Sequence, residues 1–251
     1  MDLTNRTAVI TGSGSGIGRA IALEFGRNGA NVVCCSRRKE RLEESIDLIE
    51  KEGGTAIAVP TDITVREQVQ DLVSAALDRF GQIDVLFNNA GSFNSIAGVH
   101  ELDMDIWWND VIVNLLGATL CIREILPHLM ERNEGIIINM DGGRPVGGTG
   151  YATGKAGLME LTRVLVEEQK MEGSSVIVLG AGPGLVRTEM TELQAFSEAG
   201  RKWIPSTEKS FEAGHLKKPE EIAQATIEMI KIVKPEHSGK QYGPDTDFSE
   251  W

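Results

Sequence analysis

Short apolar runs alternate with amphipathic stretches along this chain, and that alternation constrains its fold more than any other feature. The amphipathic stretches carry apolar residues every three or four positions, as at Ile17, Ile21 and Phe25, which is the period of an α-helix. Runs and stretches alternate about seven times. They predict a doubly wound α/β fold, in which a parallel sheet of about seven strands has helices on both faces. The strand-length runs are Ala8–Thr11, Asn31–Ser36, Thr55–Pro60, Val85–Asn88, Gly135–Met140, Val176–Leu179 and Gly239–Tyr242.

The helix-length stretches predict how this sheet is covered. One long helix is expected over Asp103–Met130, with a kink at Pro127, because an interior proline removes a hydrogen bond and clashes with the preceding turn. Residues 187–216 are mixed in composition and predict irregular structure. No low-complexity linker or internal repeat divides the chain, which favours one domain over residues 1–251. The other expected helices include Lys39–Lys51, Val65–Phe80, Tyr151–Met171 and Pro219–Val233.

Composition excludes several classes of partner. The formal net charge of −12 should repel nucleic acid and anionic lipid. The three cysteines have no CxxC spacing, and the four histidines have no metal-ligand spacing, so we expect neither a disulfide nor a metal site. The first apolar run is too short for a signal peptide, and no segment approaches transmembrane length. These features favour a protein of the reducing cytoplasm.

A glycine-rich turn joins the first run to the first amphipathic stretch. It reads T-G-x-x-x-G-x-G from Thr11 to Gly18. Glycines at such a turn let the backbone approach a pyrophosphate, and the following helix points its free N–H groups at the phosphates. The turn therefore favours nucleotide binding over a plain strand-to-helix connection.

Further motifs follow in a fixed order. Asn88-Asn89-Ala90-Gly91 ends the fourth run, and Tyr151-x-x-x-Lys155 opens a later helix. Together with the glycine turn they resemble the short-chain dehydrogenase/reductase family across nearly the whole chain. The resemblance implies a Rossmann-like fold and hydride transfer with a nicotinamide dinucleotide, although fold alone does not prove chemistry. The cofactor contacts that it implies are Gly12, Ser15, Gly16, Ile17, Gly18, Asp62, Ile63, Asn89, Ala90, Gly91, Tyr151, Lys155, Pro183, Gly184, Val186 and Thr188.

The end of the second run bears on which dinucleotide binds. Ser36 stands where NAD-binding members of the family carry an acid, and Arg37 follows it. A guanidinium can pair with a 2′-phosphate, and a serine brings no repulsion. This pattern favours NADP(H) over NAD(H). Arg38 and Lys39 are as easily read as the solvated start of the next helix.

Tyr151 and Lys155 lie four residues apart on an expected helix, so both project from one face. An ammonium beside the phenol should lower the pKa of Tyr151 and make it a general acid in reduction and a general base in oxidation. In the family the lysine also holds the nicotinamide ribose. The resemblance further implies that Asn114 shapes its helix and holds a water in a proton relay.

One departure from the family pattern concerns the substrate site. A serine usually precedes the tyrosine in an Asn-x-Ser-Ser context, but here the sequence reads Asn139-Met140-Asp141-Gly142. Three interpretations stay open. Another donor (Thr149, Ser92 or a water) positions the carbonyl, or Asp141 binds a hydroxylated substrate, or carbonyl chemistry is lost and the protein is a dinucleotide-binding sensor or partner subunit. Losing one such donor costs about 10²–10³ in rate, which impairs an enzyme without erasing it.

The expected function is therefore an NADP(H)-dependent oxidoreductase that interconverts a carbonyl and an alcohol, with a small-molecule substrate of unspecified identity. Residues 187–216, after Thr188, should form a substrate lid, in which Trp203, Phe196 and Phe211 either line a pocket or pack against the domain. By resemblance, the protein is expected to be a homodimer or homotetramer.

Overall fold

The computed structural model describes residues 1–251, with the side chain of every residue except Glu250. Seven strands form one parallel sheet in the order β3-β2-β1-β4-β5-β6-β7. The order reverses direction at β1 and β4, so a crevice opens there at the carboxyl ends of the strands. The strands are β1 (Thr7–Thr11), β2 (Asn31–Ser36), β3 (Thr55–Pro60), β4 (Val85–Asn88), β5 (Ile136–Met140), β6 (Ile177–Ala181) and β7 (Gln241–Tyr242).

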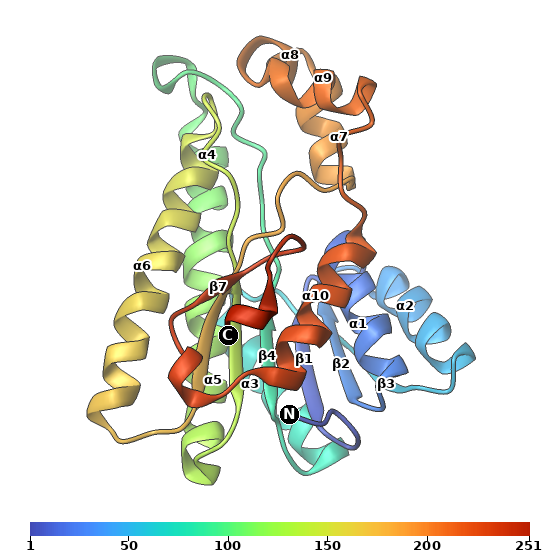
Figure 1. The fold of residues 1–251 in the computed structure, drawn as a ribbon. Coiled ribbons are helices and arrows are strands. Elements are labelled where there is room, and N and C mark those ends of the chain that lie inside the picture. Colours follow the sequence, from blue (N-terminus) through green and yellow to red (C-terminus); the bar gives the residue numbers. More distant parts are fainter.

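Helices cover both faces of the sheet, as the alternating pattern predicted (Figure 1). One face carries α1 (Gly16–Arg27), α2 (Lys39–Lys51) and α10 (Pro219–Ile232); the other carries α3 (Arg66–Phe80), α5 (Ala118–Arg132) and α6 (Thr149–Met171). Each layer buries its own apolar cluster against the strands. Burial on both faces explains why the strands are continuous apolar runs without alternation.

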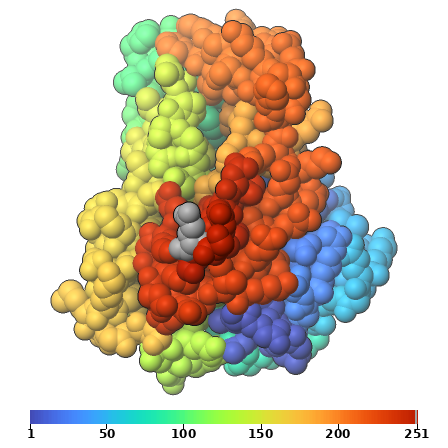
Figure 2. All heavy atoms as spheres, viewed as in Figure 1, coloured from blue at the N-terminus to red at the C-terminus, as the bar shows by residue number. Residues whose placement is uncertain are grey.

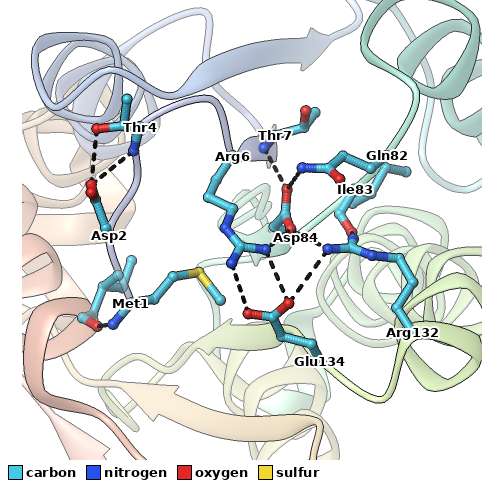
Figure 3. A network of polar contacts seen from close by, with 11 residues as sticks. Met1, Asp2, Thr4, Arg6, Thr7, Gln82, Ile83, Asp84, Arg132 and Glu134 are labelled. Carbon is cyan, nitrogen blue, oxygen red and sulfur yellow. Dashed lines mark hydrogen bonds and ion pairs between the residues drawn. The ribbon is translucent and has the colours of Figure 1, made fainter.

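An ionic network closes the sheet at the edge away from the crevice (Figure 3). The side chain of Asp84 is fully buried and accepts hydrogen bonds from Arg6 Nη1 (2.8 Å), Arg132 Nη2 (2.7 Å) and the backbone N–H of Thr7 (2.8 Å). Glu134 binds the outer side of the Arg6 guanidinium. The network joins the start of β1 to the segment before β4 and to the end of α5.

The long helix expected over Asp103–Met130 consists of three joined segments: α4 (Met104–Val111), the π-helical η2 (Ile112–Gly117) and α5. α5 runs through Pro127 without a break, and Pro127 is exposed. Met104–Arg132 is also long and apolar enough to cross a membrane by length and composition, which corrects the expectation that no segment approaches that length. In the structure the α5 part of this stretch packs on the sheet through the buried residues Cys121, Ile125 and Leu129.

Residues 187–216 were expected to be irregular and instead form three short helices: α7 (Glu189–Phe196), α8 (Glu198–Trp203) and α9 (Pro205–Glu212). Their starts are capped, since Thr188 accepts a hydrogen bond from the N–H of Thr191 and Ser197 accepts one from Gly200, and Pro205 occupies the first position of α9. The remaining elements are the short turns η1 (Val99–Glu101), η3 (Pro235–His237) and η4 (Phe248–Glu250).

Candidate active site

A groove with a volume of about 480 Å³ opens at the carboxyl ends of the strands. It is bounded by the turn after β1, the end of β2, the turn after β4, the start of α6 and the start of α7. Of the predicted cofactor contacts, all but Gly18, Gly184 and Val186 line it. The lining set is Gly12, Ser15, Gly16, Ile17, Ser36, Arg37, Asp62, Ile63, Asn89, Ala90, Gly91, Tyr151, Lys155, Pro183 and Thr188.

The glycine turn has the geometry that its sequence predicted. Gly12 and Gly16 have positive φ angles of 70° and 54°, which side chains disfavour. A Cβ on Gly18 would lie 2.5 Å from Asn89 Nδ2, so Gly18 allows close packing beneath the groove instead of lining it. Ser15 begins α1 without a side-chain cap. The first N–H groups of α1 therefore face the groove and suit an anion such as pyrophosphate.

The Asn88–Gly91 turn fastens this loop to the centre of the sheet. Asn89 Nδ2 donates to the carbonyl of Thr11 at 2.9 Å. The backbone N–H groups of Asn89 and Ala90 both donate to Thr11 Oγ1 at 3.0 Å. The turn thus supports the end of β1 and also borders the groove.

The far end of the groove is basic. Arg37 is exposed, lines the groove and forms no ion pair with any side chain that the structure describes. Arg38 and Arg41 are instead engaged by Glu189 of α7, at 3.7 and 3.3 Å. Nearby, burial opposes ionisation of Asp62, but hydrogen bonds from Thr64 and the charge of Arg37 lower its pKa overall. Arg37 is therefore the guanidinium left available for an anionic ligand at this end.

Tyr151 and Lys155 project from the first turns of α6 into the groove, as predicted. Lys155 is buried, its Nζ donates to the carbonyl of Met140 at 2.7 Å, and it lies 5.9 Å from the centre of the Tyr151 ring. Burial lowers the pKa of Lys155 to about 8. The prediction of a lowered tyrosine pKa was wrong for the protein without cofactor. Burial and the charge of Asp141 raise the pKa of Tyr151 to about 12, and the charge of Arg144 offsets only part of that rise.

Asn114 does not line the groove but lies directly behind it, on η2. Its Nδ2 donates to the carbonyls of Ser92 (2.6 Å) and Asp110 (2.8 Å). Its Oδ1 is buried without a partner among the described residues, and a Cβ on Gly91 would lie 2.9 Å from it and 3.8 Å from Lys155 Nζ. A π-helical segment often marks a functional position in a helix. Asn114 is thus placed to shape this helix and to offer one free acceptor beside the lysine.

No side chain at position 142 fits this arrangement. A Cβ on Gly142 would lie 2.7 Å from Tyr151 Cζ and closer still to the hydroxyl, so the phenol occupies the space beside the Gly142 backbone. Of the two alternative donors, Ser92 Oγ already donates to Asp110 at 2.5 Å. Thr149 Oγ1 accepts from Trp107 at 3.1 Å and does not line the groove. Asp141 lines the groove and pairs with Arg144 at 2.8 Å.

Two residues that the sequence analysis missed shape the site. Phe93 lines the groove and stacks on Tyr151, with ring centres 4.6 Å apart and an interplanar angle of 11°. Asp110, on α4, is fully buried and hydrogen-bonded to the loop that carries Phe93. Only a phenylalanine two residues after Gly91 hinted at the first, and an acid one turn before Asn114 hinted at the second.

The 187–216 segment packs over the groove and against the loops on its other side. Trp203 fits between Gly98 and Gly147, where a Cβ would lie 2.7 Å and 2.8 Å from its ring atoms, and Lys202 pairs with Glu101 at 3.0 Å. Figure 2 shows the orange part of the chain resting against green and yellow-green parts. Trp203, Phe196 and Phe211 pack among themselves or on these loops, while Met190 and Leu193 line the groove.

A glycine-lined crevice at the switch point of a parallel sheet, with an uncapped helix start and a Tyr-Lys pair, defines a dinucleotide-binding α/β protein. A family model described as short chain dehydrogenase matches residues 6–198, and the chain belongs to this family of nicotinamide-dependent oxidoreductases.

Characterised relatives cover almost the whole chain. Glucose 1-dehydrogenase 2 of Bacillus subtilis is 32% identical over 91% of this chain and 89% of its own. The 3-oxoacyl-(acyl-carrier-protein) reductase FabG of Thermotoga maritima is 31% identical over 98% of both chains. Among solved structures, an actinorhodin polyketide ketoreductase with NADPH superimposes with a TM-score of 0.85 at 27% identity, covering 95% of each chain.

Proposed function

We propose that this protein is an NADP(H)-dependent oxidoreductase that interconverts a ketone or aldehyde and an alcohol, with Tyr151 as the acid/base. The observation that carries the proposal is the joint placement of Tyr151 and Lys155 in the same groove as the glycine turn and Arg37. One cofactor can therefore reach from the basic end to the phenol.

The residues of the groove fit a dinucleotide. The N–H groups at the start of α1 would bind the pyrophosphate, and Gly12 and Gly16 leave room for it. Arg37 and Ser36 would bind a 2′-phosphate, while Asp62 and Ile63 border the adenine end. An NADPH-bound structural neighbour is consistent with this choice. When bound, the nicotinamide supplies or takes the hydride.

Protons at this site would move through the chain's own residues. Tyr151 is protonated at neutral pH, because its pKa is about 12, and so it is ready to donate to a carbonyl oxygen in the reductive direction. Lys155 would hold the nicotinamide ribose. The unpartnered Oδ1 of Asn114 would hold a water that relays protons to Lys155. Asn114 and Lys155 then resupply the phenol after each turnover.

The competing proposal is a dinucleotide-binding sensor or partner subunit with little catalysis, since Gly142 offers no hydroxyl. Retention of Tyr151, Lys155 and Asn114 in one cluster favours the enzyme. The 187–216 segment would serve as the substrate lid over a single domain. Exposed apolar residues on α4, η2 and α6 suit the contact of a homodimer or homotetramer: Ile106, Trp108, Leu116 and Val164. Three buried, unpaired cysteines suit a cytoplasmic protein.

A screen of ketones and aldehydes for NADPH oxidation tests the proposal. We expect turnover by the wild-type protein and its loss in Tyr151→Phe. Tyr242→Phe is a matched control, because Tyr242 is the only other tyrosine and bonds Thr226 within the core; its turnover should stay near that of the wild type. NADPH binding without turnover of any carbonyl would instead support the sensor.

A further inference from the structure

We propose that Phe93 is the positioning residue for Tyr151, and that the buried carboxylate of Asp110 holds the loop that presents Phe93. The inference rests on the proposed role of Tyr151. It identifies how this chain orients its phenol although position 142 offers no serine hydroxyl.

Asp110 organises the loop through several donors at once. Ser92 Oγ (2.5 Å) and Ser95 Oγ (2.6 Å) donate to its carboxylate. The backbone N–H groups of Asn94 (3.0 Å) and Ser95 (2.8 Å) donate to it as well. A carboxylate that is 0% exposed is costly to bury unless its hydrogen bonds are made, and here the donors come from both sides of Phe93. The loop therefore has one strongly favoured conformation.

Phe93, held by this loop, restricts the orientation of Tyr151 by packing against its ring. Its ring lies nearly parallel to the Tyr151 ring at 4.6 Å and is itself 3% exposed. Gly148 meets the tip of the same ring, where a Cβ would lie 2.5 Å from Phe93 Cζ and 2.8 Å from Phe93 Cε2. The Phe93 ring therefore contacts both Gly148 and Tyr151. Any added group at 148 would displace the Phe93 ring.

Tyr151 needs this support because polar contacts do not supply it. Its hydroxyl donates no hydrogen bond to any described residue and rests against Gly142. Lys155, its nearest cation, is bound to Met140. Flat contact with Phe93 on one ring face is therefore the interaction that fixes where the hydroxyl points.

Two substitutions disturb the contact between Phe93 and Tyr151 in different ways. Phe93→Ala removes the stacked ring, and Gly148→Ala displaces it without altering a groove-lining residue. Gly143→Ala is the matched control, since its Cβ would meet only Pro145 Cδ at 3.9 Å. We expect kcat to fall by about tenfold or more in the first two variants, because small misplacements of reacting groups cost up to about 10² in rate. NADPH affinity and the activity of Gly143→Ala should stay within about twofold of wild type.

A spectroscopic measurement tests the positioning role of Phe93 without requiring turnover. In a Tyr242→Phe background Tyr151 is the sole tyrosine, so near-ultraviolet absorbance after a rapid jump to about pH 11 reports its ionisation alone. We expect little tyrosinate in that background and a clear increase with Phe93→Ala. Asp110→Asn should also raise it, because an amide offers one acceptor where the loop supplies several donors.

The kinetic and spectroscopic measurements distinguish failure of the oxidoreductase proposal from failure of the positioning proposal. If the wild-type protein reduces no carbonyl but the variants still differ in tyrosinate, the oxidoreductase proposal fails and the positioning stands. If the wild type turns over and Phe93→Ala matches it in both kcat and tyrosinate, the positioning proposal is overturned. A rise in KM alone, with kcat and tyrosinate unchanged, also overturns it, because Phe93 would then only bind substrate.

Discussion

The hydroxyl of Tyr151 lies against the backbone of Gly142, in space that any side chain at that position would need. The absence of a serine at position 142 and the position of the phenol are therefore linked, because the phenol occupies the space that a serine side chain would need. Glycine at 142 leaves that space to the phenol, which has Asp141 and Arg144 as charged neighbours and Lys155 Nζ 5.9 Å from the centre of its ring. The site is consequently an altered arrangement of the Tyr-Lys pair, with its own packing.

Restoring the serine should therefore impair the enzyme. In Gly142→Ser and Gly142→Ala the new Cβ forces the Tyr151 ring away, so we expect kcat to fall by about 10-fold to 100-fold in both. Steady-state kinetics with the best carbonyl substrate measures this. A Gly142→Ser enzyme faster than wild type would show that the site merely lacks a donor.

We expect the buried Lys155 to lower the free energy of unfolding at neutral pH. Its folded pKa of about 8 lies below the ordinary 10.5, so the unfolded chain binds more protons between these values and the unfolding free energy rises with pH across that window. Lys155→Met should raise the unfolding free energy by about 1–3 kcal/mol at pH 7, after loss of the bond to Met140. Urea denaturation measures it.

The stability gain of Lys155→Met should shrink as the pH rises from about 8 to 10.5, because the wild-type lysine then becomes neutral. A gain that does not depend on pH would mean that packing, and not the buried charge, is responsible. A loss of stability at pH 7 would contradict the assigned pKa direction.

We expect Arg37 to determine the preference for NADPH over NADH. Arg37→Ala removes a charge-assisted hydrogen bond worth about 1.5–3 kcal/mol, so NADPH should bind about 10-fold to 100-fold more weakly while NADH changes little. Lys39→Ala is the control, because Lys39 is exposed and pairs only with Glu43. Fluorescence titration of both cofactors tests this. Tighter NADH than NADPH binding by the wild type would refute the cofactor choice.

The Asp84 network should matter for stability and not for turnover, since it lies at the opposite edge of the sheet. Asp84→Ala removes the buried acceptor that Arg6, Arg132 and the backbone N–H of Thr7 share, and we expect a loss of about 1–3 kcal/mol. Glu134→Gln, at an exposed pair, should cost less than about 1 kcal/mol. Thermal unfolding measures both. Equal losses would show that burial of Asp84 is not decisive.

The sequence predicted the sheet, the backbone of the glycine turn and the placement of Tyr151 and Lys155 on one helix face, because each depends on local patterns. The period of apolar residues identifies strands and helices, and the glycines of the turn after β1 are required by its backbone. Asp110 and Phe93 escaped prediction because their role arises from tertiary contact: an acid on a helix usually faces solvent, and nothing local shows that Asp110 is buried beneath residues 92–95.

The prediction for the pKa of Tyr151 was wrong for a related reason. Spacing along α6 shows that Lys155 is near, but not how deeply both residues are buried, and burial dominates. The helices of residues 187–216 were missed because short helices depend on caps such as Thr188 and Ser197 more than on a long apolar period.

Transfer of deuterium from NADPH labelled at C4 of the nicotinamide to a carbonyl substrate tests the central claim most directly. Mass spectrometry of the alcohol should show the label with wild-type protein and with Tyr242→Phe, and none above background with Tyr151→Phe. Equal labelling by Tyr151→Phe, or no labelled alcohol from wild-type protein saturated with NADPH across the substrate panel, would contradict the account.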